Sequence, residues 1–229
     1  MLRMTFELVT REGSRPVEIE YDRLIAIGYA GRNTEKTMEH IRELERDLGV
    51  PAPKRIPTIF NMAPQLLTQD NGLLFAGDKT SGEAEYVMIM QGGRLYIGLG
   101  SDHTDRKLES SDVLKAKQVC LKPVAGILWD YEELKDHWDS IALGSDQVIS
   151  GEVRAYQNGS LADIMTPELL LDELKERTGD ISHAVIFSGT VPLLSGFAYG
   201  DHFSGFMRDG ALGREIRLEY DVNRAAEDE

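Results

Sequence analysis

Two adjacent glycines between strand-like segments constrain the fold of this 229-residue chain more than any other feature. The tetrapeptide Gln91-Gly92-Gly93-Arg94 separates two largely apolar segments, Glu83 to Met90 and Leu95 to Gly100. A two-residue type I′ turn needs positive φ at both central positions, and glycine adopts that conformation without strain. The sequence therefore predicts a β-hairpin closed by the two glycines.

The register of this hairpin brings three carboxylates to one face. Counting outward from the turn, Glu85 lies opposite Gly100. One pair further out, Glu83 lies opposite Asp102. Since side chains alternate along a strand, Glu83, Glu85 and Asp102 share a face, with directly opposed Cβ atoms roughly 5 Å apart. His103 points to the opposite face, so it is not assigned as a ligand.

Like charges opposed across a sheet repel one another, and a bound cation would offset that repulsion. A set of oxygen ligands suits a hard divalent ion, so we expect Mg²⁺ or Mn²⁺ at Glu83, Glu85 and Asp102, with Ca²⁺ as a further candidate. We interpret Gly98 and Gly100 as leaving room for a ligand near the backbone. The alternative is a solvated acidic face that binds no ion.

The N-terminal segment has the pattern of a small α/β unit. Short strands are predicted at 5–9, 17–21 and 24–30, followed by a helix from Thr34 to about Leu48 that ends at Gly49. Four prolines between Pro51 and Pro64 indicate an extended connector. We therefore predict an N-terminal subdomain over residues 1–50 and a catalytic core over residues 51–229.

The remaining segments predict more strands than helices. Asn158-Gly159 indicates a second hairpin, and a helix is expected from Pro167 to Gly179, with Thr166 as its N-cap. Further strands are expected at 184–188 and 214–220. Because strands and helices do not alternate regularly, the pattern favours an α+β, strand-rich fold.

Composition excludes some classes of partner. The formal net charge of -14 argues against nucleic acid, which is bound by clustered Lys and Arg. A single cysteine, Cys120, cannot form an intramolecular disulfide. No apolar signal-peptide region and no run long enough to cross a bilayer is present, so we expect a cytoplasmic, soluble protein without a membrane partner.

Several motifs, taken in order, resemble those of the fumarylacetoacetate hydrolase family. Glu83-Ala84-Glu85 is similar to its Glu-x-Glu metal strand, and 102–106 resembles its Asp-x-Ser/Thr-x-Arg segment. Ala116-Lys117 is similar to the stretch with the active-site lysine, and 188–190 resembles the substrate loop. His40 and Glu43 match its His-x-x-Glu helix. The resemblance covers about residues 28–190 and implies the fold of that family's C-terminal catalytic domain.

The resemblance assigns roles to these residues. Glu43 would orient His40, which would take a proton from water. Lys117 would stabilise an enolate, with Lys122 as the rival for that position. Arg106 would grip a substrate carboxylate, although a plain salt bridge is its other reading. The substrate loop would contribute two further residues, Gly189 and Thr190.

The function implied is a metal-dependent hydrolase that cleaves a carbon–carbon bond in a 2-oxo acid or β-dicarbonyl substrate resembling an acylpyruvate. Decarboxylation or isomerisation of a 2-oxo acid is the alternative within the family. A non-catalytic protein that binds a small carboxylate is the alternative from another class. The resemblance also implies a homodimer.

Overall fold

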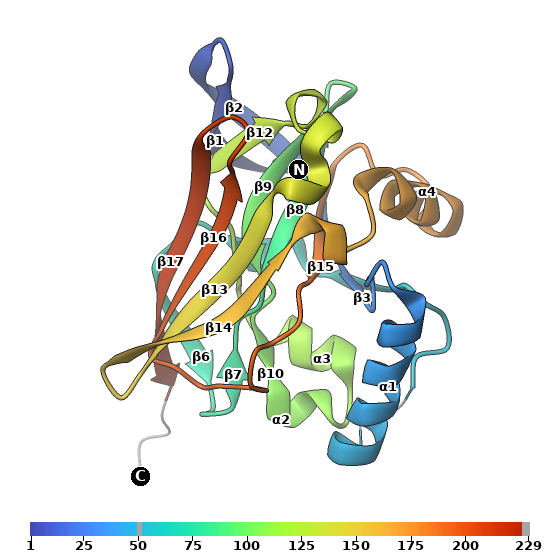
Figure 1. Ribbon diagram of the computed structural model, residues 1–229, viewed down its shortest axis with the longest axis vertical. Coiled ribbons are helices and arrows are strands. Elements are labelled where there is room, and N and C mark those ends of the chain that lie inside the picture. The colour runs from blue at the N-terminus through green and yellow to red at the C-terminus, as the bar shows by residue number, and fades with distance from the viewer. Residues whose placement is uncertain (50–51, 226–229) are drawn as a thin grey trace.

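The computed structural model describes residues 1–49 and 52–225 (Figure 1). Its longer helices are α1 (Thr34–Leu48) and α4 (Pro167–Thr178), and two short ones are α2 (Arg106–Glu109) and α3 (Val113–Gln118). Short 3₁₀ segments occur at Pro64–Leu66, Tyr131–Glu133, Lys135–Ser140 and Leu161–Asp163. The strands of the first half are β1 (Leu2–Thr10), β2 (Gly13–Tyr21), β3 (Arg23–Gly28), β4 (Thr58–Met62), β5 (Leu67–Thr68), β6 (Gly72–Ala76), β7 (Thr80–Ser81), β8 (Ala84–Gln91), β9 (Arg94–Ser101) and β10 (Thr104–Asp105). Those of the second half are β11 (Lys122–Pro123), β12 (Ile127–Asp130), β13 (Ala142–Ile149), β14 (Glu152–Ser160), β15 (Ala184–Thr190), β16 (His202–Asp209) and β17 (Arg214–Ala225).

Two large sheets enclose the main core. One has the strand order β2-β1-β12-β9-β8-β15-β3-β4, and the other has the order β14-β13-β16-β17-β6. Alternate residues of β8 face opposite sides of the first sheet. Met88 packs toward the second sheet, with Leu99 and Met207, whereas Val87 belongs to a separate apolar cluster with Phe187. The predicted α+β, strand-rich fold is confirmed.

The predicted hairpin register is confirmed. β8 and β9 are antiparallel, and Glu85 pairs with Gly100. The turn glycines, Gly92 and Gly93, have φ of 57° and 76°, as a type I′ turn requires. One step beyond the paired strands, the Asp102 N–H donates to the Glu83 carbonyl over 3.0 Å. The glycine pair thus fixes the position of the acidic residues at the other end of the hairpin.

The two glycines near these carboxylates serve packing rather than ligand access. A Cβ on Gly100 would lie 2.5 Å from the Phe187 ring and 2.7 Å from Val87. A Cβ on Gly98 would lie 2.9 Å from a Leu128 methyl group. The interpretation of these glycines as room for a ligand is therefore wrong, because apolar side chains of the core occupy the space.

The segments on both sides of the proline-rich connector share one sheet. β1, β2 and β3 precede it, and they lie in the same eight-stranded sheet as β8, β9 and β15. Only part of the connector is described, because residues 50 and 51 lie outside the described ranges. The division into units at 1–50 and 51–229 stays a prediction.

The second predicted hairpin is placed differently in the structure. Asn158 and Gly159 lie within β14 and pair with β13 rather than forming a turn. The turn falls at Ser150 and Gly151, which have φ of 53° and 82°. Gly159 is needed for close approach, since a Cβ there would lie 3.0 Å from the Val191 side chain. The Asn-Gly turn prediction is wrong because Gly159 is required for packing against a distant segment rather than for a turn.

In Figure 1, α2 and α3 lie beside β10 and β7 at the lower end of the molecule, and α4 lies on the side of β15. None of the helices in the described ranges has the length and apolarity that crossing a bilayer requires.

Replacing Gly100 by alanine should destabilise the protein by about 1–3 kcal/mol, because the added methyl group overpacks the core. Urea unfolding followed by circular dichroism measures this difference. Gly72→Ala is the matched control, since nothing lies within 4 Å of its Cβ position, and its effect should stay within about 0.5 kcal/mol. Equal effects of the two substitutions would contradict the packing role of Gly100.

Candidate active site

The predicted metal ligands and the substrate-loop residues come from the ends of three adjacent strands. Glu83 immediately precedes β8, Glu85 lies within it, and Asp102 immediately follows β9. The next strand of the sheet, β15, places Thr190 in register with Glu85. After Asp102 the chain forms β10, and the Asp105 carboxylate then caps α2 by accepting from two backbone N–H groups. These short elements return basic side chains to the carboxylates.

Two lysines hold Asp102, which is fully buried. The Lys117 ammonium donates to one carboxylate oxygen, and the Lys122 ammonium lies 2.8 Å from the other. Burial by itself would raise the pKa of Asp102, but the two ammonium charges outweigh it and hold the pKa below its ordinary value. The structure therefore brings both lysines to Asp102, and the choice of Lys117 over Lys122 as the active-site lysine stays a prediction.

Glu85 is buried without an ion-pair partner among the described residues. Burial raises its pKa well above the ordinary value, and the charge of Asp102 raises it further. Lys117 acts in the opposite direction, as does the Gly189 N–H, which donates to the Glu85 carboxylate over 2.9 Å. A buried carboxylate beside other negative charges favours either a proton or an additional cation.

Arg106 is committed to neighbouring protein groups. Its Nε donates to the Ser81 hydroxyl over 2.8 Å, and its Nη2 lies 3.0 Å from the Glu83 carboxylate. Its Nη1 donates to Glu109 over 3.1 Å, and the ring of Phe197 lies 4.3 Å from its Cζ. With only 3% of its side chain exposed, Arg106 organises Glu83 and Glu109. Its predicted contact with substrate stays a prediction.

The loop residues Gly189 and Thr190 border Glu85 through different groups. Gly189 supplies the N–H just described and has φ of 93°, a conformation that favours glycine. The Thr190 hydroxyl donates to the Ala84 carbonyl over 2.7 Å and accepts from the Gln157 amide over 2.6 Å. Its proton is thus used within the protein, so toward a substrate this hydroxyl is only an acceptor.

The predicted dyad lies on α1, and the structure describes it only in part. The side chain of His40 lies outside the described residues, and Glu43 is exposed. Their role in activating water therefore stays a prediction. His103, which was not assigned as a ligand, is buried, stacks on Phe75 at 3.8 Å and hydrogen-bonds the Tyr220 hydroxyl at 2.9 Å.

Among the side chains that the structure describes, no three of His, Cys, Asp or Glu are grouped closely enough to hold a metal ion. Two of the three predicted ligands instead face basic side chains, since Asp102 contacts two lysines and Glu83 contacts Arg106. The chemistry of the donors nevertheless fits a hard divalent cation. All are carboxylate oxygens, and Glu85 is a buried acid with no basic ion-pair partner in the described ranges. The metal assignment to Glu83, Glu85 and Asp102 stays a prediction that this donor set supports.

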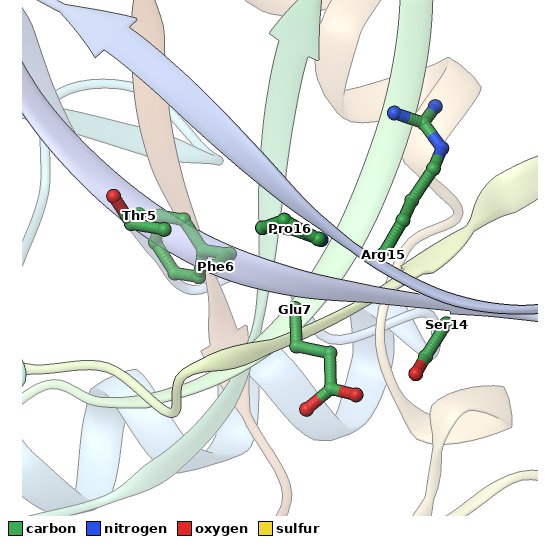
Figure 2. Close-up of a pocket in the computed structure, with 6 residues that line it drawn as sticks. All are labelled: Thr5, Phe6, Glu7, Ser14, Arg15 and Pro16. Atoms are coloured by element: carbon green, nitrogen blue, oxygen red, sulfur yellow. The ribbon is translucent and has the colours of Figure 1, made fainter.

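A separate hollow of about 340 Å³ lies on the β1–β2 hairpin, lined by Thr5, Phe6, Glu7, Ser14, Arg15 and Pro16. Figure 2 shows that these side chains fan away from the two strands and do not converge on a common point. None of the predicted site residues lines this hollow.

Sequence reasoning missed two residues of the site. Glu109 contacts Arg106 and acts electrostatically on Lys117, and its position three residues after Arg106 was the available signal. Gln157 accepts from the Ala84 N–H over 2.8 Å and donates to Thr190, and so ties β14 to the start of β8. No local pattern indicates Gln157, because its partners are distant in sequence.

Replacing Glu85 by glutamine should stabilise the protein at alkaline pH in the presence of a chelator. Because folding raises the Glu85 pKa, the ionised form weakens the folded state as pH rises above about 4.3, the ordinary pKa, and fully so above the folded pKa. Glutamine removes that penalty, worth roughly 1.4 kcal/mol per pKa unit, and can still accept from Gly189. Thermal unfolding at pH 5 to 8 measures the gain, which should shrink as pH falls. A variant that is less stable than wild type at every pH would show that ionised Glu85 does not weaken the folded state.

Comparisons with known proteins agree with this fold. A family model described as "Protein of unknown function (DUF2848)" matches residues 27–220. No curated protein sequence matches the chain.

Three solved structures illustrate the similarity of fold. Cg1458 superposes with a TM-score of 0.67 at 15% identity, covering 93% of this chain and 81% of that one. A 2-keto-3-deoxy-D-arabinonate dehydratase complexed with magnesium and 2,5-dioxopentanoate gives 0.64 at 16% identity, covering 96% and 79%. A putative fumarylacetoacetate hydrolase family protein from Yersinia pestis CO92 gives 0.63 at 15% identity, covering 95% and 99%. The predicted resemblance to the fumarylacetoacetate hydrolase fold is confirmed, and since the family model spans most of its length, the chain belongs to the DUF2848 family.

Proposed function

We propose that this protein is a divalent-cation-dependent enzyme acting on a 2-oxo acid or β-dicarbonyl compound, and that it hydrolyses a carbon–carbon bond in an acylpyruvate-like substrate. The observation that carries the proposal is the buried grouping of Glu85 and Asp102, at the ends of the adjacent strands β8 and β9, with Lys117 of α3. Buried charges at such density are expensive to maintain and are typical of catalytic sites.

Glu83, Glu85 and Asp102 would hold the cation, which, when bound, supplies a Lewis acid for the oxygens of a 2-oxo acid. A similarly folded protein, the 2-keto-3-deoxy-D-arabinonate dehydratase, is complexed with magnesium and 2,5-dioxopentanoate in one structure. That compound is a 2-oxo monocarboxylate, which supports the proposed substrate class for this chain.

Lys117 would stabilise the negative charge that develops during bond cleavage. Burial opposes its positive charge, but Asp102, Glu109 and Glu85 favour it and raise its pKa above the ordinary value, so the ammonium group persists at neutral pH. Water adds to the acyl carbon, the carbon–carbon bond breaks, and its electron pair passes to the enolate of pyruvate. Protonation of that enolate carbon completes the products, pyruvate and a carboxylic acid.

Dehydration is the second candidate, and one observation favours it. Water attack requires a base such as the His40–Glu43 pair, yet Glu43 is exposed on α1. Elimination from a 3-deoxy-2-oxo sugar acid also needs a base, which removes a proton from C3, and the hydroxyl group on C4 then leaves as water. It uses the same enolate stabilisation, but its base acts on the substrate and no attacking water is required. Decarboxylation and isomerisation would also use enolate stabilisation without an attacking water. A non-catalytic carboxylate-binding protein is the alternative from another class.

A substrate panel separates these reactions. We expect turnover of an acylpyruvate with Mg²⁺ or Mn²⁺ and loss of turnover with chelator, with the products identified by mass spectrometry. Conversion of a 2-keto-3-deoxy sugar acid or of oxaloacetate instead would assign dehydration or decarboxylation. Failure of Mg²⁺ and Mn²⁺ to raise the melting temperature would overturn the metal assignment, because specific binding stabilises the native state.

Replacing Lys117 by methionine should lower kcat by about 10²–10³-fold, the effect expected on losing one group that stabilises developing charge. Lys107→Met is the control, since Lys107 is an exposed lysine of α2, and it should leave kcat unchanged. Steady-state kinetics on the best substrate measures both. Equal kcat values for wild type and Lys117→Met would remove Lys117 from the chemistry.

A further inference from the structure

Seven ionisable side chains form one electrostatically connected group, called here the charged cluster. Its members are Glu83, Glu85, Asp102, Arg106, Glu109, Lys117 and Lys122. The charged side chains that act most strongly on Glu85, Asp102 and Lys117 are all members of this group. His103 lies against it but is held neutral, because burial and then the charges of Lys122 and Arg106 lower its pKa well below the ordinary value.

The contacts divide the charged cluster into three parts. Arg106 lies between Glu83 and Glu109, which leaves one negative charge in excess. Asp102 lies between Lys117 and Lys122, which leaves one positive charge in excess. Glu85 adds a negative charge. The formal charge of the charged cluster is therefore −1, and a divalent cation would make it +1.

A net charge in a buried site is costly, so the bound complex is most stable when the substrate brings the total to zero. One carboxylate achieves this, whereas a second would leave the site negative. Glu109 decides the balance, because Arg106 is already matched by Glu83. Glu109 also lies nearer solvent than Arg106, with 17% of its side chain exposed against 3%, and its charge acts on the half-buried Tyr29 at the end of β3.

We propose that Glu109 is a specificity-determining residue that selects 2-oxo acids with a single negative charge over those with two. The inference rests on the proposed divalent-cation and 2-oxo acid site. No residue was predicted from the sequence to select substrates by charge, and the inference assigns that role to Glu109.

The experiment compares two five-carbon acids that differ by one carboxylate, 2-oxopentanoate and 2-oxoglutarate. Isothermal titration calorimetry in saturating Mn²⁺ gives the Kd of each for the full-length protein. Wild type should bind 2-oxopentanoate more tightly. Glu109→Gln should shift the ratio of the two Kd values by roughly tenfold toward 2-oxoglutarate, which is the effect of one unit charge about 12 Å away at an effective dielectric constant of about 20.

Two further variants distinguish selection from structural damage. Glu109→Asp keeps the charge and should keep the wild-type ratio. Glu152→Gln makes the same change of net charge at an exposed residue of β14 that pairs with Arg154, and it should also keep the ratio. A wild-type preference for 2-oxoglutarate overturns the inference even if Glu109→Gln does not fold, and so does a ratio that Glu109→Gln leaves unchanged. Mn²⁺-dependent binding of both acids would in those cases leave the proposed function standing, whereas no Mn²⁺-dependent binding of either acid would overturn both.

Discussion

The burial of Asp102 between two ammonium groups is the interaction on which the rest of the site depends. A buried carboxylate and two buried lysines are each unfavourable alone, and they are tolerated only because their charges and hydrogen bonds are matched. The chain achieves this match with very short elements. β9 places Asp102, α3 returns Lys117, and β11 returns Lys122 together with a contact to the His103 carbonyl. The short elements after β9 thus serve charge pairing at Asp102 in addition to the burial of apolar residues such as Ala116 and Cys120.

The hairpin and its carboxylates could be predicted because their cause is local. Two glycines with positive φ fix the turn, the turn fixes the register, and the side-chain period of two then fixes which residues share a face. The same locality explains the success at α4, where Pro167 begins the helix and Gly179 ends it. For the candidate site, the sequence therefore predicts where Glu85 and Asp102 lie on the sheet.

The partners of these residues could not be predicted from local pattern. Asn158-Gly159 has the composition of a turn, yet Val191 packs so close to Gly159 that the glycine serves the interior of β14. Likewise, Gly100 faces Phe187, which lies far along the chain, and packing in the core therefore requires the small size of Gly100. In each case the residue type was informative and its purpose depended on a contact between distant segments. Turn propensity and strand period contain no information about such contacts.

The predicted site residues lie partly on strands of the large sheet and partly on helix α1. In the proposed function, this division bears on which reaction follows enolate formation. Stabilising developing charge needs donors and charges fixed in advance. In the proposed function, the ends of β8, β9 and β15 would supply them, within a sheet whose central strands bury side chains on both faces. Attack by water needs a base, and the predicted base lies on α1, outside that sheet. Under the proposed function, a fold built in this way would keep its charge-stabilising residues unchanged while changes in α1 decide between hydrolysis and elimination. Reaction type in this protein is therefore expected to depend on α1, and substrate charge on the residues around Arg106.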